Sequence, residues 1–162
     1  MSNNKVYILS EAIRTGKTTA LQDWIKKRSN VTGFLTPDIN GKRMFFDIET
    51  GQLLDMEKPN GELSVGKFNF DKKSFEYIEK SVRNSWDLCH AEFMVIDEIG
   101  PLEIRKDSGF HQLVLHLLST INEATPDLLF VVRDNCLEEF VSKYNFKEVK
   151  ILRIVDIKNN SF

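Results

Sequence analysis

Short apolar runs that alternate with amphipathic segments constrain the fold of this chain more than any other feature of its sequence. The runs are rich in β-forming residues and fall at 5–10, 31–35, 92–97, 128–132 and 149–155. Segments whose apolar residues recur at helical spacing lie between them, around 20–25 and at 72–88, 109–122 and 136–144. This alternation predicts an α/β fold in which a mostly parallel central sheet carries helices on both faces.

A different pattern interrupts the alternation between residues 42 and 70. Three β-like pieces there are bounded by Asn40-Gly41, Thr50-Gly51 and Asn60-Gly61, and such dipeptides favour the tight turns of hairpins. We therefore expect a β-hairpin insertion at about 40–70 within a single domain of residues 1–162. A chain of 162 residues, 41% of them hydrophobic, has room for one core of this kind.

The charge and ligand patterns favour neither a nucleic acid nor a zinc ion. The formal net charge is −2 and both signs are mixed along the chain, so no basic face offers the counterion release that drives nucleic-acid binding. Cys89 and Cys136 lie far apart without the spacing of a zinc site or a disulfide framework. We expect His90, His111 and His116 to be ordinary surface or helix residues.

The hydropathy pattern indicates an aqueous compartment. No stretch is long enough to span a bilayer, and residues 1–5 lead into the first apolar run without a signal-peptide core. We expect a cytoplasmic protein without a membrane partner, either a monomer or a weak oligomer.

Gly16-Lys17-Thr18-Thr19 stands between the first predicted strand and the first predicted helix, as the end of a P-loop does. Such a loop wraps its N–H groups around the phosphates of a nucleoside triphosphate, while its lysine reaches the β- and γ-phosphates and its hydroxyl ligates Mg²⁺. A lone Gly-Lys-Thr also begins ordinary helices after a turn, but the preceding strand favours the P-loop. The predicted nucleotide-binding residues are Glu11, Ala12, Ile13, Arg14, Thr15, Gly16, Lys17, Thr18 and Thr19.

The loop departs from the usual P-loop pattern at two positions. Glu11 stands where the first glycine belongs, and Arg14 where many such loops have another glycine. A carboxylate that points inward at Glu11 repels phosphate, whereas a guanidinium at Arg14 donates hydrogen bonds to it. These two residues leave open whether the loop supports catalysis or binding alone.

Asp97 and Glu98 end a strong apolar run, which places them at the carboxyl edge of the sheet, where ligands of open α/β sheets bind. Asp97 fits the Walker B role of a Mg²⁺-site carboxylate together with Thr18. Glu98 is then the candidate that orients the attacking water, and Lys17 joins it as a catalytic candidate. An acidic turn at the end of a strand is the alternative interpretation.

Three arginines are candidates for stabilising charge on the γ-phosphate: Arg43, Arg105 and Arg133. Arg133 is the first choice and is taken as a third catalytic candidate, because it follows the 128–132 run and should reach the same sheet edge as Asp97. A surface salt bridge is the alternative role for it.

Aromatic residues gather in and near the insertion. We expect five phenylalanines to form a core beneath the hairpin, although any one of them could stack on a nucleobase, since every base has a π-face. They are Phe34, Phe45, Phe46, Phe68 and Phe70.

Residues 95–103, Val-Ile-Asp-Glu-Ile-Gly-Pro-Leu-Glu, resemble the DEIG-x-(M/L)-E signature of the THEP-type nucleoside triphosphatases. A second segment, residues 33–38, resembles the GF-x-T-x-E stretch of that family, and residues 43–48 resemble its R-x-GF-D-x hairpin with Phe45 in place of the glycine. Phe75-Glu76 and Phe110 also stand where the family places such residues. The resemblance thus spans nearly the whole chain.

The resemblance implies a RecA-like three-layer P-loop domain with a catalytic glutamate beside the Walker B aspartate. It further implies Mg²⁺-dependent hydrolysis of ATP, GTP and other NTPs to NDP and phosphate with loose base selectivity. Carried onto this chain, it assigns the phosphate and metal roles to residues 16–19, the Mg²⁺ role to Asp97 and water activation to Glu98.

Two other functions remain open. The altered loop residues Glu11 and Arg14 suit a nucleotide-binding module with weak or absent catalysis. The size of the chain and its P-loop also suit a nucleotide or nucleoside kinase, which transfers phosphate to an acceptor instead of water. The sequence contains no obvious arginine-rich lid segment, and a glutamate beside the Walker B aspartate favours water activation, so the kinase is the last of the three.

Overall fold

A computed structural model describes residues 6–12 and 15–162 and shows an eight-stranded sheet at its centre. The strand order is β10-β1-β9-β8-β2-β4-β3, with β5 paired to β4. The five strands from β10 to β2 run parallel, and β4 joins β2 antiparallel, which confirms the predicted mostly parallel α/β sheet. Its strands are β1 (Val6–Glu11), β2 (Val31–Leu35), β3 (Asp38–Ile39), β4 (Lys42–Asp47), β5 (Leu53–Asp55), β8 (Phe93–Ile99), β9 (Asp127–Arg133) and β10 (Lys150–Leu152).

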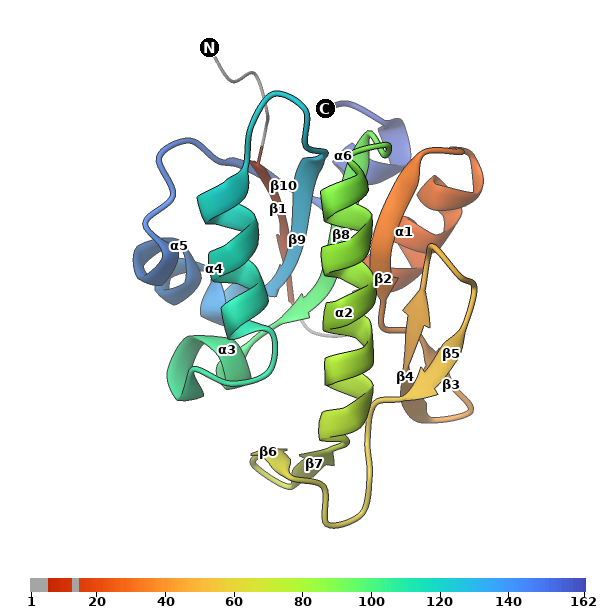
Figure 1. Cartoon of the computed structure of the whole chain (residues 1–162), viewed down its shortest axis with the longest axis vertical. Helices are drawn as coiled ribbons and strands as arrows, with labels where there is room; N and C mark the ends of the chain where they lie inside the picture. The colour runs from red at the N-terminus through yellow and green to blue at the C-terminus, as the bar shows by residue number, and fades with distance from the viewer. Residues whose placement is uncertain (1–5, 13–14) are drawn as a thin grey trace.

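Helices cover both faces of the sheet, so the domain has three layers (Figure 1). One buried cluster joins the sheet to α2, α3, α4 and α5, and a second joins the opposite face to α1 and α6. The helices are α1 (Lys17–Lys26), α2 (Lys72–Leu88), α3 (Pro101–Lys106), α4 (His111–Thr120), α5 (Leu137–Tyr144) and α6 (Ile154–Asn159), with a 3₁₀ turn, η1 (Asp134–Cys136), before α5.

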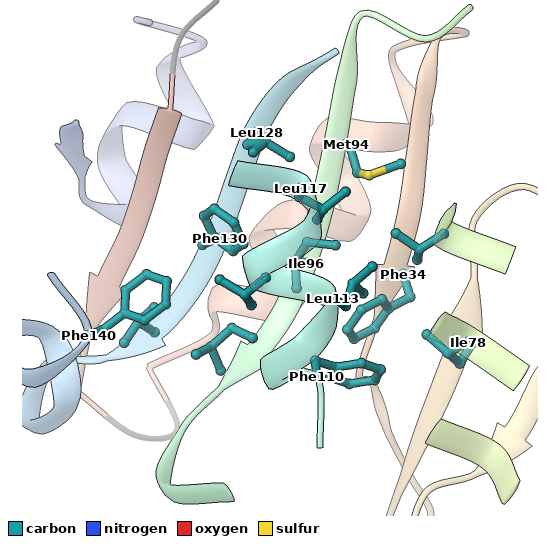
Figure 2. Close-up of a cluster of buried hydrophobic side chains, with 14 of the residues drawn as sticks. Phe34, Ile78, Met94, Ile96, Phe110, Leu113, Leu117, Leu128, Phe130 and Phe140 are labelled. Carbon is teal, nitrogen blue, oxygen red and sulfur yellow. The ribbon is translucent and has the colours of Figure 1, made fainter. Parts of the chain in front are cut away.

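Strand β8 lies between the two layers of helices, which explains why its sequence is a continuous apolar run. Met94 and Ile96 belong to the cluster under α2 and α4, whereas Val95 belongs to the cluster under α1. Figure 2 shows Met94 and Ile96 beside Leu113 and Leu117 of α4. Because β8 is packed on both faces, its position in the sheet is fixed, and so is the position of Asp97 and Glu98 near its end.

The predicted insertion consists of two separate β units. Strands β3, β4 and β5 extend the main sheet, while β6 (Leu63–Val65) and β7 (Phe68–Phe70) form a two-stranded sheet of their own near α3. Phe34 and Phe45 are fully buried as expected. The expectation for Phe68 is wrong, because 46% of this residue is exposed: it lies on β7, away from the main sheet.

Two short helices, α3 and α6, were not predicted from the sequence. The predicted strand at 149–155 is shorter, since β10 ends at Leu152 and α6 begins two residues later. The carboxylate of Asp156 accepts the N–H of Arg153 in a capping box, and this local hydrogen bond favours a helical turn over continued pairing. Similarly, Glu103 caps α3 directly after β8. Both helices follow a strand without a loop, so apolar spacing alone does not separate them.

No helix within residues 6–12 and 15–162 has both the length and the apolar character that crossing a bilayer requires.

Candidate active site

The carboxyl ends of four neighbouring parallel strands bring the predicted site residues to one edge of the sheet. Glu11 ends β1 and is paired in register with Arg133, which ends β9. Asp97 and Glu98 lie near the end of the adjacent strand β8, and Thr36 follows β2. This is the edge where open α/β sheets bind their ligands.

The predicted phosphate loop ends at Gly16, which has a φ of 90° and directly precedes α1. Glycine adopts this left-handed conformation without steric cost, so the chain can turn into the helix there. The Nζ of Lys17 donates hydrogen bonds to the carbonyl oxygens of Glu11 (3.0 Å) and Ala12 (2.8 Å), and so spans the loop. Burial lowers the pKa of Lys17, although the charges of Glu98 and Asp97 act in the opposite direction.

The side chain of Glu11 is directed to the start of α6. Its Oε1 accepts a hydrogen bond from the N–H of Ile154 at 2.8 Å, so the carboxylate serves one of the free donors at that helix terminus. Two of the predicted phosphate-binding residues, Ile13 and Arg14, lie outside the described residues. Of the others, Ala12, Thr15 and Thr19 are exposed, and Thr15 Oγ1 donates to the Ala12 carbonyl at 2.7 Å.

Replacing Glu11 with alanine should therefore affect stability more than nucleotide binding. The loss of its hydrogen bond to Ile154 should lower the free energy of unfolding by about 1 kcal/mol. Urea unfolding measures that change, and calorimetric titration with NTP should give the same affinity as the wild type. A marked rise in affinity would show that the carboxylate faces the phosphates.

Asp97 is fully buried and connects the first turn of α1 to the end of β2. Its Oδ2 accepts hydrogen bonds from Thr18 Oγ1 and from the N–H of Thr36, both at 2.9 Å. Burial raises the pKa of Asp97 to about 6, while these two donors act to lower it. The hydroxyl and carboxylate predicted to form the metal site are thus in direct contact.

The oxygen groups around Asp97 fit a magnesium ion. Thr36 is 3% exposed, and its hydroxyl has no hydrogen-bond partner among the described residues, although its own N–H is bound to Asp97. A buried hydroxyl without a partner needs a water or an ion. Because Mg²⁺ takes oxygen ligands and keeps several waters, Thr18 and Asp97 would hold it, with Thr36 beside its water shell. Nothing in the sequence pattern pointed to a role for Thr36 at this site.

Glu98 occupies an irregular position in β8. It has a φ of 103°, and the pairing of β8 with β9 shifts register between Asp97 and Ile99. The irregularity places Ile99 in the same buried cluster as Ile96, which strict alternation along the strand would not do. A left-handed conformation is costly for a residue with a side chain and is often found at functional sites. Here the residue is Glu98, whose side chain is 22% exposed and which directly follows the buried Asp97.

Two arginines from different parts of the chain hold the Glu98 carboxylate. Arg43 of β4 donates to Oε2 at 2.8 Å, and Arg133 donates to Oε1 at 3.1 Å. Arg105, the third candidate, instead pairs with Glu139 at 2.7 Å on the exposed side of α3. The structure therefore brings Arg43 and Arg133 to the site and places Arg105 elsewhere.

Glu103 supports the segment that follows Glu98. It is 3% exposed, and its carboxylate accepts the N–H groups of Gly100 (3.0 Å) and Phe110 (3.1 Å). Gly109 has a φ of 57°, and a Cβ there would lie only 2.4 Å from Glu103 Oε1. Burial raises the pKa of Glu103 to about 7 against the effect of the two N–H donors.

The raised pKa of Glu103 should make stability depend on pH. The unfolded chain loses this proton near pH 4.5 and the folded protein near pH 7, so the free energy of unfolding should fall as pH rises between these values. The fall should amount to about 1–3 kcal/mol. Glu103→Gln cannot titrate and should lack this component in urea unfolding at pH 5 and pH 8. Glu138→Gln, on an exposed residue of α5, is the control, and equal pH slopes in the two variants would mean that Glu103 does not cause the pH dependence.

The hydrogen bonds and ion pairs of the histidines and cysteines in the described residues do not reach Lys17, Thr18, Asp97 or Glu98. Within residues 6–12 and 15–162, no group of three or more His, Cys, Asp or Glu residues is arranged to hold a metal ion. His111 bonds the hydroxyl of Tyr144 at 2.8 Å, and His90 lies 3.4 Å from Glu49. Cys89 and Cys136 are free thiols, the latter buried. The side chains that the structure brings together at this edge of the sheet are carboxylates, hydroxyls and arginines, with Lys17 beside them.

Comparison with known proteins agrees with this geometry. The family model described as NTPase matches residues 6–162. A nucleoside-triphosphatase THEP1 from Saccharolobus solfataricus is 35% identical over 101 residues, which cover 56% of this chain and 57% of that relative. The crystal structure of THEP1 from the hyperthermophile Aquifex aeolicus has the same fold, with a TM-score of 0.72 at 17% identity and 96% of both chains covered. The chain therefore belongs to the THEP-type nucleoside triphosphatase family.

Proposed function

We propose that this protein hydrolyses nucleoside triphosphates, ATP and GTP among several, to NDP and phosphate with Mg²⁺. The observation that carries the proposal is the contact between Thr18 and Asp97, 2.9 Å apart, with the Glu98 carboxylate on the next residue of the same strand. A hydroxyl from the first turn after a Gly-Lys pair meets a strand-end carboxylate in this way in P-loop NTPases. The weaker alternative, binding without turnover, rests on the altered loop residues Glu11 and Arg14.

Each group of the site has a separate task in this reaction. The loop N–H groups and Lys17 bind the β- and γ-phosphates, and Thr18 and Asp97 would hold the magnesium ion, which neutralises charge on the phosphate oxygens when it is bound. Glu98 accepts a hydrogen bond from a water in line with the γ-phosphorus. The water oxygen bonds to phosphorus as the bond to the β,γ-bridging oxygen breaks, and the proton of the water leaves through Glu98.

The arginines around Glu98 supply positive charge next to this reaction. In the described structure, Arg43 and Arg133 neutralise the Glu98 carboxylate, which has 22% of its side chain exposed. When the γ-phosphate carries the larger negative charge, it competes with Glu98 for these guanidinium groups. An arginine that moves from Glu98 to the γ-phosphate then leaves the Glu98 carboxylate free to bind the water.

Arg133 and Arg105 provide a matched pair of substitutions. Arg133→Ala removes a cation in contact with Glu98 and should lower the rate of phosphate release by about 10²-fold or more, whereas Arg105→Ala removes only a surface ion pair. Steady-state phosphate release with saturating ATP and Mg²⁺ measures both variants. Equal rates in the two variants would mean that Arg133 does not take part in the reaction.

The proposed reaction can be tested by the fate of oxygen. Hydrolysis in ¹⁸O-labelled water should give phosphate with one labelled oxygen and unlabelled NDP, because water attacks the γ-phosphorus. Label in the NDP would mean attack at the β-phosphorus. No reaction, with NTP still bound, would favour the binding module.

A further inference from the structure

Arg153 is the first residue after β10, and it lies on the side of β1 that is opposite to Asp97 and Glu98. Strand β10 pairs with one edge of β1 and β9 with the other, and β8 follows β9. Neighbouring strands are about 4.8 Å apart, so the ends of β10 and β8, three strands away from each other, are separated by about 14 Å. The loop after β1 therefore has the carboxylates of the site on one side and an arginine on the other.

The guanidinium group of Arg153 is held at the start of the predicted phosphate loop. Its Nη1 donates a hydrogen bond to the carbonyl oxygen of Ser10 at 3.2 Å. The next two carbonyl oxygens along the chain, those of Glu11 and Ala12, accept hydrogen bonds from the Nζ of Lys17. Two cations from different parts of the chain are thus bonded to three consecutive carbonyl groups, and both lie beside the expected path of the phosphates.

The charge of Arg153 is not taken up by a neighbouring carboxylate. Within residues 6–12 and 15–162, its side chain forms no ion pair. The Glu11 carboxylate accepts the N–H of Ile154 instead, and Asp156 accepts the backbone N–H of Arg153. A guanidinium group has five N–H donors, of which the Ser10 carbonyl accepts one. Because Arg153 is exposed, its other donors are available to a ligand.

The direction of the nucleotide indicates which part of it Arg153 meets. The proposed function places the γ-phosphate beside Glu98 and the β- and γ-phosphates at Lys17. The remainder of the nucleotide then continues on the other side of the loop, toward β10, and the α-phosphate is the next charged group along it. Arg43 and Arg133 are bonded to Glu98 at the γ-phosphate end. Arginine suits a phosphate group, since its planar fork donates two parallel hydrogen bonds to the oxygens.

We propose that Arg153 binds the α-phosphate of the NTP. The guanidinium group keeps its hydrogen bond to Ser10 and donates others to the non-bridging oxygens of that phosphate. Every NTP has the same α-phosphate, so the contact adds affinity without selecting a base. The α-phosphate does not change in the reaction, so the contact stabilises the bound substrate and the transition state equally. This inference rests on the proposed NTP and Mg²⁺ site.

Arg153→Gln is the main test, because glutamine can still donate to the Ser10 carbonyl but has no charge. KM should rise about 10- to 100-fold for ATP, GTP, CTP and UTP alike, with kcat nearly unchanged. Phosphate release at several NTP concentrations with Mg²⁺ measures both parameters, and calorimetric titration should show the same loss of affinity. Arg153→Lys keeps a cation and should retain part of the affinity. Lys158→Ala removes an exposed cation from the last turn of α6 and should change neither parameter.

A second substrate series separates the α-phosphate from the base and the ribose. The rise in KM should be the same for 2′,3′-dideoxy-ATP as for ATP, since both have an α-phosphate and only ATP has the ribose hydroxyls. A rise that is confined to some bases would mean that Arg153 binds the base, and a rise that disappears with dideoxy-ATP would mean that it binds the ribose. Either result would overturn the assignment to the α-phosphate.

The outcomes also separate this inference from the proposed hydrolysis. Wild-type KM and affinity in Arg153→Gln, with phosphate release intact, would overturn the role of Arg153 and leave the NTPase standing. A fall in kcat without a change in KM would also overturn it, because the contact would then not be one of uniform binding. If wild type binds NTP without turnover, the calorimetric affinities still decide the role of Arg153. Absence of NTP binding in wild type would overturn the proposed function and this inference together.

Discussion

Phosphate release should fall by about 10²–10⁴-fold when Glu98 is replaced by glutamine, while the affinity for NTP changes little. Glutamine has nearly the same shape, and its single amide oxygen can keep one of the two guanidinium hydrogen bonds, either that of Arg43 or that of Arg133. It cannot take a proton from water. The loss should therefore appear in kcat, measured as steady-state phosphate release at saturating ATP and Mg²⁺.

Glu138→Gln is the matched control for Glu98→Gln. Glu138 is an exposed residue at the start of α5, so its substitution should leave the rate unchanged. Calorimetric titration with ATP should show binding in wild type and in both variants. A Glu98→Gln variant that turns over as fast as the control would mean that another group accepts the proton.

Lys17→Ala should weaken nucleotide binding and catalysis together, with kcat/KM lower by about 10²–10³-fold or more. The ammonium of Lys17 donates hydrogen bonds to the carbonyl oxygens of Glu11 and Ala12, and within the described residues it forms no direct ion pair with a carboxylate. Its charge is available to the β- and γ-phosphates in both the ground state and the transition state. Phosphate release over a range of ATP concentrations measures both effects.

Lys26→Ala serves as the control for Lys17→Ala. Lys26 lies in the last turn of α1, and 77% of its side chain is exposed in a surface pair with Asp23, so its loss should leave both parameters unchanged. If Lys17→Ala kept the kcat/KM of the wild type, the loop that ends in Gly16 and Lys17 would not act as a P-loop.

The sequence predicted those parts of the fold that depend on burial. Strands β8 and β9 are buried on both faces and therefore appear as continuous apolar runs, and α2 shows its buried side at helical spacing. The short helices α3 and α6 were not predicted, because each is fixed by a capping carboxylate, Glu103 or Asp156, and not by a long apolar face. Phe68 was misplaced for a related reason: an apolar residue in a β run does not reveal which sheet its strand joins.

The candidate site was predictable in composition but not in its contacts. The end of an apolar strand brought Asp97 to the sheet edge, and its hydrogen bond to Thr18 joins residues that the sequence separates by 79 positions. The Glu11 carboxylate is held by the N–H of Ile154 at the start of α6, and one of the two arginines that bind Glu98, Arg43, comes from the insertion. Such contacts depend on tertiary structure, so local sequence patterns do not predict them. The catalytic roles of these residues stay predictions.

We expect the sheet edge that carries Thr18, Asp97 and Glu98 to hydrolyse nucleoside triphosphates. Phosphate release from ATP, GTP, CTP and UTP, with and without Mg²⁺, should be measured for wild type and Glu98→Gln in parallel. Wild type should release phosphate from several of the four nucleotides only when Mg²⁺ is present, and the variant should lose this release. No release from wild type that still binds NTP in calorimetry would contradict this expectation and favour a nucleotide-binding module.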